Sequence, residues 1–176
     1  MKIFIPLDES LIKKLKIGDF IEIYGKIFTG RDAVLPKIAD LIKKNELKKL
    51  DVRFNGGVFF HTGVSKAGIG PTSSNKVEIE ENIPCISSTG IKIHLGKGKL
   101  TKETVDILNS YNSIYAVTPP ISAYFQEKVK EIRLVAFPEL GMEAMYEINV
   151  IGIPAIVAIA HGESIFKEIN YEKINK

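Results

Sequence analysis

Residues 91–117, IKIHLGKGKLTKETVDILNSYNSIYAV, carry the clearest fold signal in this chain. The pattern predicts a strand over Ile91–Leu95 that ends in a turn of glycines and lysines. Thr101 is then placed to cap a helix running to about Asn109, and Ile114–Val117 forms a second short strand. Strands that alternate with helices indicate a sheet covered by helices.

The same alternation continues toward the C-terminus. The expected elements are a helix from Pro119 or Pro120 to about Glu131, a strand over Ile132–Phe137, a short helix over Glu139–Tyr146 and a buried strand over Ala155–Ala160. We therefore predict an α/β fold in which a mixed sheet is flanked by helices.

The N-terminal half is less regular. Phe20–Phe28 alternates loosely and predicts a strand, after which Asp32 could cap a helix with Pro36 in its first turn. Gly56–Val64 indicates another strand, and Ala67–Ser74 is a loop rich in glycine and hydroxyl groups. This half is expected to add β structure to the sheet.

Length and charge narrow the class of protein. The 176 residues fit one domain over 1–176, and 45% hydrophobic residues exclude a disordered chain. The 24 basic and 21 acidic residues give a net charge of +3, too balanced for a nucleic-acid binder.

The distribution of apolar residues favours a cytoplasmic protein. Met1–Asp8 lacks a stretch suited to a signal peptide. The longest apolar run, near Val150–Ala160, is shorter than the roughly 20 residues that a membrane-spanning helix needs. The only cysteine, Cys85, cannot form an internal disulfide or hold a metal cluster by itself, and its context favours a buried, inert thiol.

Three short segments have residues suited to binding an anion. Arg31 lies in a predicted strand-to-helix turn, where its guanidinium could hold a carboxylate or could simply pair with a nearby acid. Gly68–Lys76 could bind an anion or place a hydroxyl for proton transfer, or be an ordinary tight loop. Gly96–Lys99 could bring Lys97 to a ligand, or be a flexible turn.

Other polar residues give weaker signals. The three histidines, His61, His94 and His161, are far apart in sequence, lack metal-ligand spacing and are expected to be structural. Glu139 and Glu143 could serve as acid–base groups, but carboxylates in a short exposed helix are usually solvated.

Taken in order, these motifs resemble the β subunit, or C-terminal domain, of the iron–sulfur class I fumarate hydratases and L(+)-tartrate dehydratases. Residues 25–33, GKIFTGRDA, stand where the family reads G-x-I-x-T-A-R-D-A. Residues 70–78, GPTSSNKVE, stand where it reads close to G-P-T-T-S-x-R-M-D. The segments Gly96–Gly98, Glu139–Ala144 and Pro154–Ala158 extend the similarity, which runs from about residue 15 to residue 166.

The resemblance implies a swivelling β/β/α domain and reversible addition of water across a dicarboxylate double bond. It implies that a partner α subunit holds a [4Fe–4S] cluster, which binds the substrate as a Lewis acid, and that this chain is inactive alone. By position, Arg31, Ser73 and Lys76 would bind the substrate, a small dicarboxylate. Thr72 would assist proton transfer, and Lys97 would complete the catalytic set. A homo- or hetero-oligomer is expected.

The sequence also departs from the family pattern. Lys76 replaces an arginine, and Val34–Lys37 lacks the histidine with which the family often continues after T-A-R-D-A. These changes bear on the identity of the substrate, which could be fumarate or a related alkene, or tartrate or another 2-hydroxy acid. They also leave open a different reading, a diverged paralogue that binds a carboxylate ligand or a protein partner without catalysis.

Overall fold

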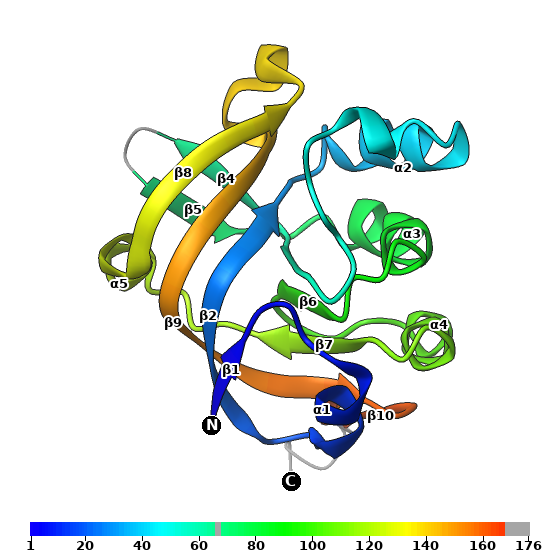
Figure 1. The fold of residues 1–176 in the computed structure, drawn as a ribbon. Coiled ribbons are helices and arrows are strands. Elements are labelled where there is room, and N and C mark those ends of the chain that lie inside the picture. Colours follow the sequence, from blue (N-terminus) through cyan, green and yellow to red (C-terminus); the bar gives the residue numbers. More distant parts are fainter. Residues whose placement is uncertain (66–67, 168–176) are drawn as a thin grey trace, which may run out of the picture.

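The computed structural model describes residues 1–65 and 68–167 of the chain (Figure 1). Its strands are β1 (Lys2–Phe4), β2 (Phe20–Thr29), β3 (Val58–Phe60), β4 (Thr62–Ser65), β5 (Gly68–Thr72), β6 (Ile93–Gly96), β7 (Ile114–Val117), β8 (Val129–Ala136), β9 (Met145–Ala160) and β10 (Glu163–Ser164). Its α-helices are α1 (Glu9–Lys14), α2 (Leu35–Lys43), α3 (Lys76–Ser87), α4 (Lys102–Ser110) and α5 (Ser122–Lys128), and its 3₁₀ helices are η1 (Leu47–Lys49) and η2 (Pro138–Glu143).

The main sheet closes on itself. Strands β2, β3, β6 and β7 pair in parallel, and the long strand β9 pairs antiparallel with both β7 and β2. Strands β1, β8 and β10 extend this ring, and β4 and β5 form a separate hairpin. The arrangement confirms the predicted mixed sheet with flanking helices.

Two hydrophobic cores follow from the alternation of side chains along the strands. In β3, Val58 and Phe60 point into the core enclosed by the ring, whereas Phe59 points into the core under the helices. In β7, Ala116 belongs to the first core and Tyr115 to the second. Each short strand is buried on both faces, which explains its continuous apolar sequence.

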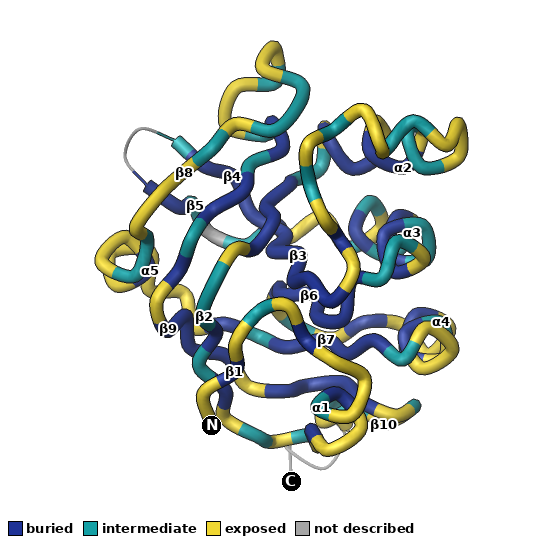
Figure 2. Tube along the Cα trace, in the orientation of Figure 1, coloured by how far each residue is buried: buried dark blue, intermediate teal, exposed yellow. Residues whose placement is uncertain are grey.

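Helices α2, α3 and α4 lie side by side against one face of the ring, and α5 lies on the opposite side (Figure 1). The faces of α2–α4 that meet the sheet are buried, whereas the residues of β8 are exposed or half-buried (Figure 2). Apolar side chains of the three helices fill the space between helices and sheet: Leu35 and Ile38 of α2, Ile79 and Ile83 of α3, and Leu108 of α4. The helices thereby fix the turns that connect them to the strands.

Several predictions for the N-terminal half were wrong. Asp32 does not cap α2, because its carboxylate accepts a hydrogen bond from Ser73 instead, and Val34 stands at the cap position. The predicted strand over Gly56–Val64 is divided at His61 into β3 and β4. Residues 68–72 of the predicted loop form strand β5, because they pair with β4; Ala67 lies outside the described residues.

In the C-terminal half most elements agree with the prediction. Strand β7 has the predicted bounds, and the Thr101 side chain caps α4 by accepting a hydrogen bond from the Thr104 N–H. Helix α5 begins later than Pro120 and ends at Lys128, since the chain then enters β8. The short helix before β9 is 3₁₀, and β9 is much longer than Ala155–Ala160.

Within residues 1–65 and 68–167, none of the helices combines the length and the apolar character that crossing a membrane requires.

Candidate functional site

The parallel strands β2, β3 and β6 end at one edge of the sheet. Arg31 lies just beyond β2, His61 follows β3, and Lys97 follows β6. The β4–β5 hairpin is tied to this edge, because the Ser73 N–H donates to the His61 carbonyl oxygen at 2.8 Å. The carboxyl ends of parallel strands are the usual place for a ligand site in an α/β fold.

The guanidinium of Arg31 is held by two carboxylates. Its Nε atom lies 3.6 Å from Glu143 Oε1 and 3.8 Å from Asp32 Oδ2. Glu143 is itself fixed, because its Oε2 accepts the Ala33 N–H at 3.1 Å. Both contacts of Arg31 are ion pairs and not hydrogen bonds: among the residues that the structure describes, the buried Nε has no hydrogen-bond partner, and no hydrogen bond reaches the two terminal nitrogens. This end of the guanidinium is therefore available to a ligand carboxylate.

Gly30 allows this turn to pack against the helix layer. A Cβ atom at this position would lie 2.8 Å from the Phe59 ring and 2.8 Å from a methyl group of Val34. Both neighbours belong to the core beneath the helices. A side chain here would therefore require the Phe59 or Val34 side chain, or the turn itself, to shift.

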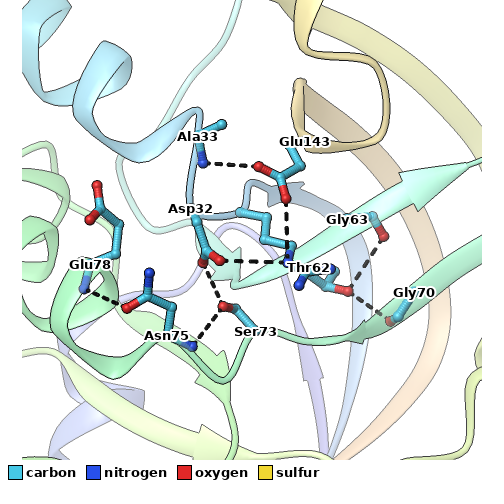
Figure 3. Close-up of polar contacts among 10 residues, drawn as sticks. Asp32, Ala33, Thr62, Gly63, Gly70, Ser73, Asn75, Glu78 and Glu143 are labelled. Carbon is cyan, nitrogen blue, oxygen red and sulfur yellow. Dashed lines mark hydrogen bonds and ion pairs between the residues drawn. The ribbon is translucent and has the colours of Figure 1, made fainter.

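Ser73 connects the hairpin to the arginine turn. Its hydroxyl donates to Asp32 Oδ1 at 2.5 Å and accepts the Asn75 N–H at 3.2 Å (Figure 3). Only 2% of Ser73 is exposed. Asp32 thus contacts both Arg31 and Ser73, and the structure brings these two predicted site residues together.

Thr72 is the last residue of β5 and pairs with Thr62 of β4. It is half-buried and lines a cavity of about 30 Å³ together with Thr118 and the start of α5. The buried Thr118 hydroxyl has no hydrogen-bond partner among the described residues. A cavity of this size holds about one water molecule, and its lining brings Thr72 next to Thr118.

Lys76 begins α3 and lies against the turn that carries Lys97. Its Nζ donates to the carbonyl oxygen of Lys99. A Cβ atom at Gly98 would lie 3.1 Å from that Nζ, and Gly98 also has a φ of +74°, which favours glycine. Lys97 is exposed, while its carbonyl oxygen accepts the Tyr115 hydroxyl at 3.0 Å. The structure therefore places the Lys76 side chain against Gly98 and Lys99, in the turn that contains Lys97.

Two histidines that are distant in sequence are neighbours in space. His61 Nε2 lies 3.2 Å from His94 Nδ1, and His94 Nε2 lies 2.9 Å from the Ser87 hydroxyl. Both imidazoles are fully buried. Burial lowers the pKa of His61 to about 3, and burial together with the neighbouring His61 lowers the pKa of His94 well below its ordinary value. Both rings are therefore neutral near pH 7.

Glu143 is the site residue that the sequence reasoning undervalued. It was expected to be a solvated carboxylate of a short helix, but it contacts both Arg31 and the Ala33 N–H. Glu139 of the same 3₁₀ helix pairs instead with Lys37. The position of Glu143 after the exposed strand β8 gives no local signal of this long-range contact.

Cys85 is half-buried rather than fully buried, and its Sγ lies 3.7 Å from the Ala39 carbonyl oxygen. Burial raises the pKa of this thiol, which keeps it protonated and unreactive. Across residues 1–65 and 68–167 no group of three His, Cys, Asp or Glu side chains could hold a metal ion. These residues do not fit an iron–sulfur cluster.

Comparison with known proteins places this arrangement in a family. The chain matches the family described as Fumarase C-terminus over residues 3–169. It is 37% identical to the putative L(+)-tartrate dehydratase subunit beta of Methanocaldococcus jannaschii, over 98% of this chain and 96% of that protein. It is 28% identical to the L(+)-tartrate dehydratase subunit beta of Escherichia coli strain K12, over 93% of this chain and 85% of that protein.

Longer relatives contain a similar segment. The putative fumarate hydratase class I of Geobacillus stearothermophilus is 27% identical over 97% of this chain, but this covers only 34% of that protein. The chain belongs to the Fumarase C-terminus family, as its sequence motifs indicated. Relatives with these names are hydro-lyases, and those named subunit beta belong to enzymes with more than one kind of subunit.

Proposed function

We propose that this chain is the β subunit of an iron–sulfur hydro-lyase that reversibly hydrates the double bond of a small dicarboxylate. Fumarate hydration to malate and tartrate dehydration are the two reactions that the names of its relatives suggest. The observation that carries the proposal is the arginine turn, in which Glu143 and Asp32 fix Arg31 and leave its terminal nitrogens available. A fixed, planar cation of this kind suits a carboxylate.

Arg31 binds one substrate carboxylate in this proposal. Glu143 and Asp32 orient the guanidinium from the side of Nε, so little rotational freedom is lost when the substrate binds. Two carboxylates beside one guanidinium leave this cluster with a net negative formal charge, so the lysines of the site must supply the positive charge that a dianion needs. Ser73 was predicted to contact substrate, and that contact stays a prediction. Its buried hydroxyl, which already donates and accepts, favours a supporting role beside Thr72.

Thr72 is the proposed hydroxyl for proton transfer. A threonine hydroxyl is a weak base, and it needs a neighbouring group to take its proton. Among the described residues, no carboxylate or imidazole forms a hydrogen bond with the Thr72 side chain. The activating group must then come from the partner subunit or the substrate, which agrees with a chain that is inactive alone.

Lys97 and Lys76 supply positive charge for the second carboxylate. The exposed Lys97 ammonium can reach a ligand, and charge builds on that carboxylate when the neighbouring carbon loses its proton. Lys76 is anchored to the Lys99 carbonyl oxygen and reinforces the positive potential there. A lysine at position 76 acts as a point charge and cannot form the two parallel bonds that an arginine forms.

In this proposal the [4Fe–4S] cluster is bound by another chain. This chain has one cysteine, half-buried and far from forming a ligand set, so it offers no site for a [4Fe–4S] group. An α subunit would hold the cluster, and the two subunits would form a hetero-oligomer. The substrate would then bind between the cluster of the partner and the sheet edge of this chain.

The architecture is part of the same proposal. Flattening the ring of strands gives two β layers, and α2–α4 add a third layer on one side (Figure 1). This order supports a swivelling β/β/α domain formed by residues 1–176, which would move as one body relative to the α subunit. We also propose a cytoplasmic location, for which cell fractionation is the direct test.

A second candidate function is that of a non-catalytic paralogue that binds a carboxylate ligand or a protein. Lys76, which replaces the family arginine, is the observation that favours it. The two functions differ in the effect of Lys76→Arg on turnover by the complete enzyme. Turnover by the wild-type complex supports the enzyme, whereas turnover that appears only with Lys76→Arg indicates a site that has lost its activity.

An anaerobic pull-down with this chain as bait tests the two-subunit proposal. The eluate is measured for iron and sulfide, and the co-purified protein is identified by mass spectrometry. An iron–sulfur partner in the eluate supports the proposal. Recovery of the chain alone, or with an iron-free partner, would contradict it and favour the non-catalytic paralogue.

A further inference from the structure

The buried pair His61 and His94 lies directly behind the sheet edge that carries the site. His61 is at the junction of β3 and β4, and His94 is in β6, the strand that leads to Lys97. The third member of the group, Ser87, is the last residue of α3, the helix that begins at Lys76. The three side chains therefore come from the three segments that position the hydroxyl and lysine residues of the site.

Hydrogen bonds connect this group to Ser73. The His61 carbonyl oxygen accepts a hydrogen bond from the Ser73 N–H at 2.8 Å. The backbone N–H of His61 donates to the Leu95 carbonyl oxygen at 2.9 Å. At the other end of α3, the Asn75 side chain caps the helix and the Asn75 N–H donates to the Ser73 hydroxyl. These hydrogen bonds, together with helix α3 between Asn75 and Ser87, form a closed circuit that starts and ends at Ser73.

The hydrogen-bond partners of the two imidazoles indicate which ring nitrogens carry protons. His61 Nδ1 is buried and has no hydrogen-bond partner among the described residues. A buried N–H without an acceptor is rarer than an acceptor without a donor, so Nδ1 of His61 is the unprotonated nitrogen. His61 Nε2–H then donates to His94 Nδ1, and His94 Nε2–H donates to the Ser87 hydroxyl.

The geometry supports a rigid unit. The two rings are nearly parallel, at an interplanar angle of 11° with their centroids 5.4 Å apart. Both are fully buried, and Ser87 is 3% exposed. Because neither ring carries charge near pH 7, the pair acts on the site through its hydrogen bonds and packing and not through charge.

We propose that His61, His94 and Ser87 are positioning residues that hold the Thr72–Ser73 segment, the N-terminus of α3 and the Lys97 turn in register. This role rests on the proposed function, since it concerns the same site. None of the three touches the substrate. They act by fixing the relative positions of the segments from which Thr72, Lys76 and Lys97 extend.

The test compares two buried serines. Ser87→Ala removes the hydroxyl that bonds to His94. Ser113→Ala removes a hydroxyl that donates to the carbonyl oxygens of Ile91 and Tyr111 and has no bond to the histidine pair. Ser113 is 2% exposed, and each variant loses one short buried hydrogen bond, of 2.9 Å at Ser87 and 2.7 Å at Ser113, while the second bond of Ser113 is a long one of 3.5 Å. Comparable losses of stability are expected from both.

The first readout needs no enzyme activity. In the isolated chain, backbone amide exchange at Ser73 should be about tenfold faster in Ser87→Ala than in Ser113→Ala. Imidazole nitrogen resonances of the wild-type chain should show an unprotonated Nδ1 on His61 and an unprotonated Nδ1 on His94 near pH 7. Equal exchange at Ser73 in both variants, or protonated Nδ1 atoms, would overturn the proposal.

The second readout uses the complete enzyme. Ser87→Ala should lower kcat by about tenfold with a smaller change in KM, because the proton-transfer segment moves while Arg31 remains in place. Ser113→Ala should retain the wild-type kcat. If the wild-type complex shows no hydro-lyase activity, the proposed function fails, and amide exchange at Ser73 still decides the role of the histidine pair.

Discussion

The Ser73 hydroxyl lies 2.5 Å from Asp32 Oδ1 and so joins two motifs that are 41 residues apart in sequence. Asp32 also lies beside Arg31, which places the hydroxyl-rich segment and the arginine turn in one polar cluster (Figure 3). The cluster forms at the sheet edge because β2 and β3 run parallel and end together.

Removing this contact should destabilise the chain. Ser73→Ala leaves a carboxylate oxygen of Asp32 and the Asn75 N–H without their partner. The free energy of unfolding should fall by about 1–3 kcal/mol, measured by urea denaturation. Ser74→Ala is the control, because Ser74 is exposed and should change stability by less than about 0.5 kcal/mol. Equal effects from both would show that the Ser73–Asp32 contact contributes nothing.

Arg31→Lys should impair substrate binding in the complete enzyme. A lysine keeps the charge but cannot make two parallel bonds to a carboxylate. We expect kcat/KM to fall on the order of 10- to 100-fold, the effect of losing one strong charge-assisted interaction. Arg53→Lys changes an exposed arginine elsewhere and should leave the kinetics unchanged. Wild-type kinetics in the Arg31→Lys enzyme would show that Arg31 does not bind the substrate.

Glu143→Gln tests the orientation of Arg31. Glutamine can still accept the Ala33 N–H but loses the ion pair with the guanidinium. We expect KM for a dicarboxylate to rise severalfold, with a smaller change in kcat. Glu139→Gln is the matched control, because Glu139 lies in the same 3₁₀ helix and pairs with Lys37. Identical KM values for the two variants would argue against the positioning role of Glu143.

The pH dependence of stability should reveal the buried histidines. The pKa of His61 falls from 6.5 to about 3 on burial, so below pH 6.5 the unfolded chain binds a proton that the folded chain does not. The free energy of unfolding should therefore decrease as pH falls from 6.5 toward 3. His61 alone contributes a loss of about 2 kcal/mol at pH 5, and His94 acts in the same direction.

His61→Phe should reduce this pH dependence between pH 6.5 and 5, measured by urea denaturation at each pH. The control is His161→Asn, which removes a histidine whose ring contacts the Leu15 carbonyl oxygen outside the buried pair. An unchanged slope in His61→Phe would mean that His61 is not held neutral in the folded chain.

The regular alternation of the second half made much of the fold predictable. Strand β7 and the Thr101 cap follow from local sequence, because an apolar run and a capping hydroxyl act over a few residues. Helix α3 was not anticipated, although Ile79, Ile83 and Ile86 recur at helical spacing. The helical spacing was not recognised because Pro84 lies inside the helix and a glycine- and hydroxyl-rich segment precedes it.

The candidate site was predictable by resemblance but not by its contacts. The motif around Arg31 identified the arginine, yet nothing local indicated that Asp32 would bind Ser73 rather than cap α2. His61 and His94 are 33 residues apart in sequence, and their contact depends on β3 pairing with β6. Such contacts are set by strand order, which a single sequence does not show.

The most direct test of the account is turnover by the chain combined anaerobically with its iron–sulfur partner. Malate and both tartrate enantiomers are offered, and formation or loss of the unsaturated or keto product is followed. We predict turnover of at least one of these 2-hydroxy acids by the complex, none by either subunit alone, and a large loss in Arg31→Lys. A complex with an intact cluster that converts none of these substrates, or an isolated chain that converts one, would contradict the account.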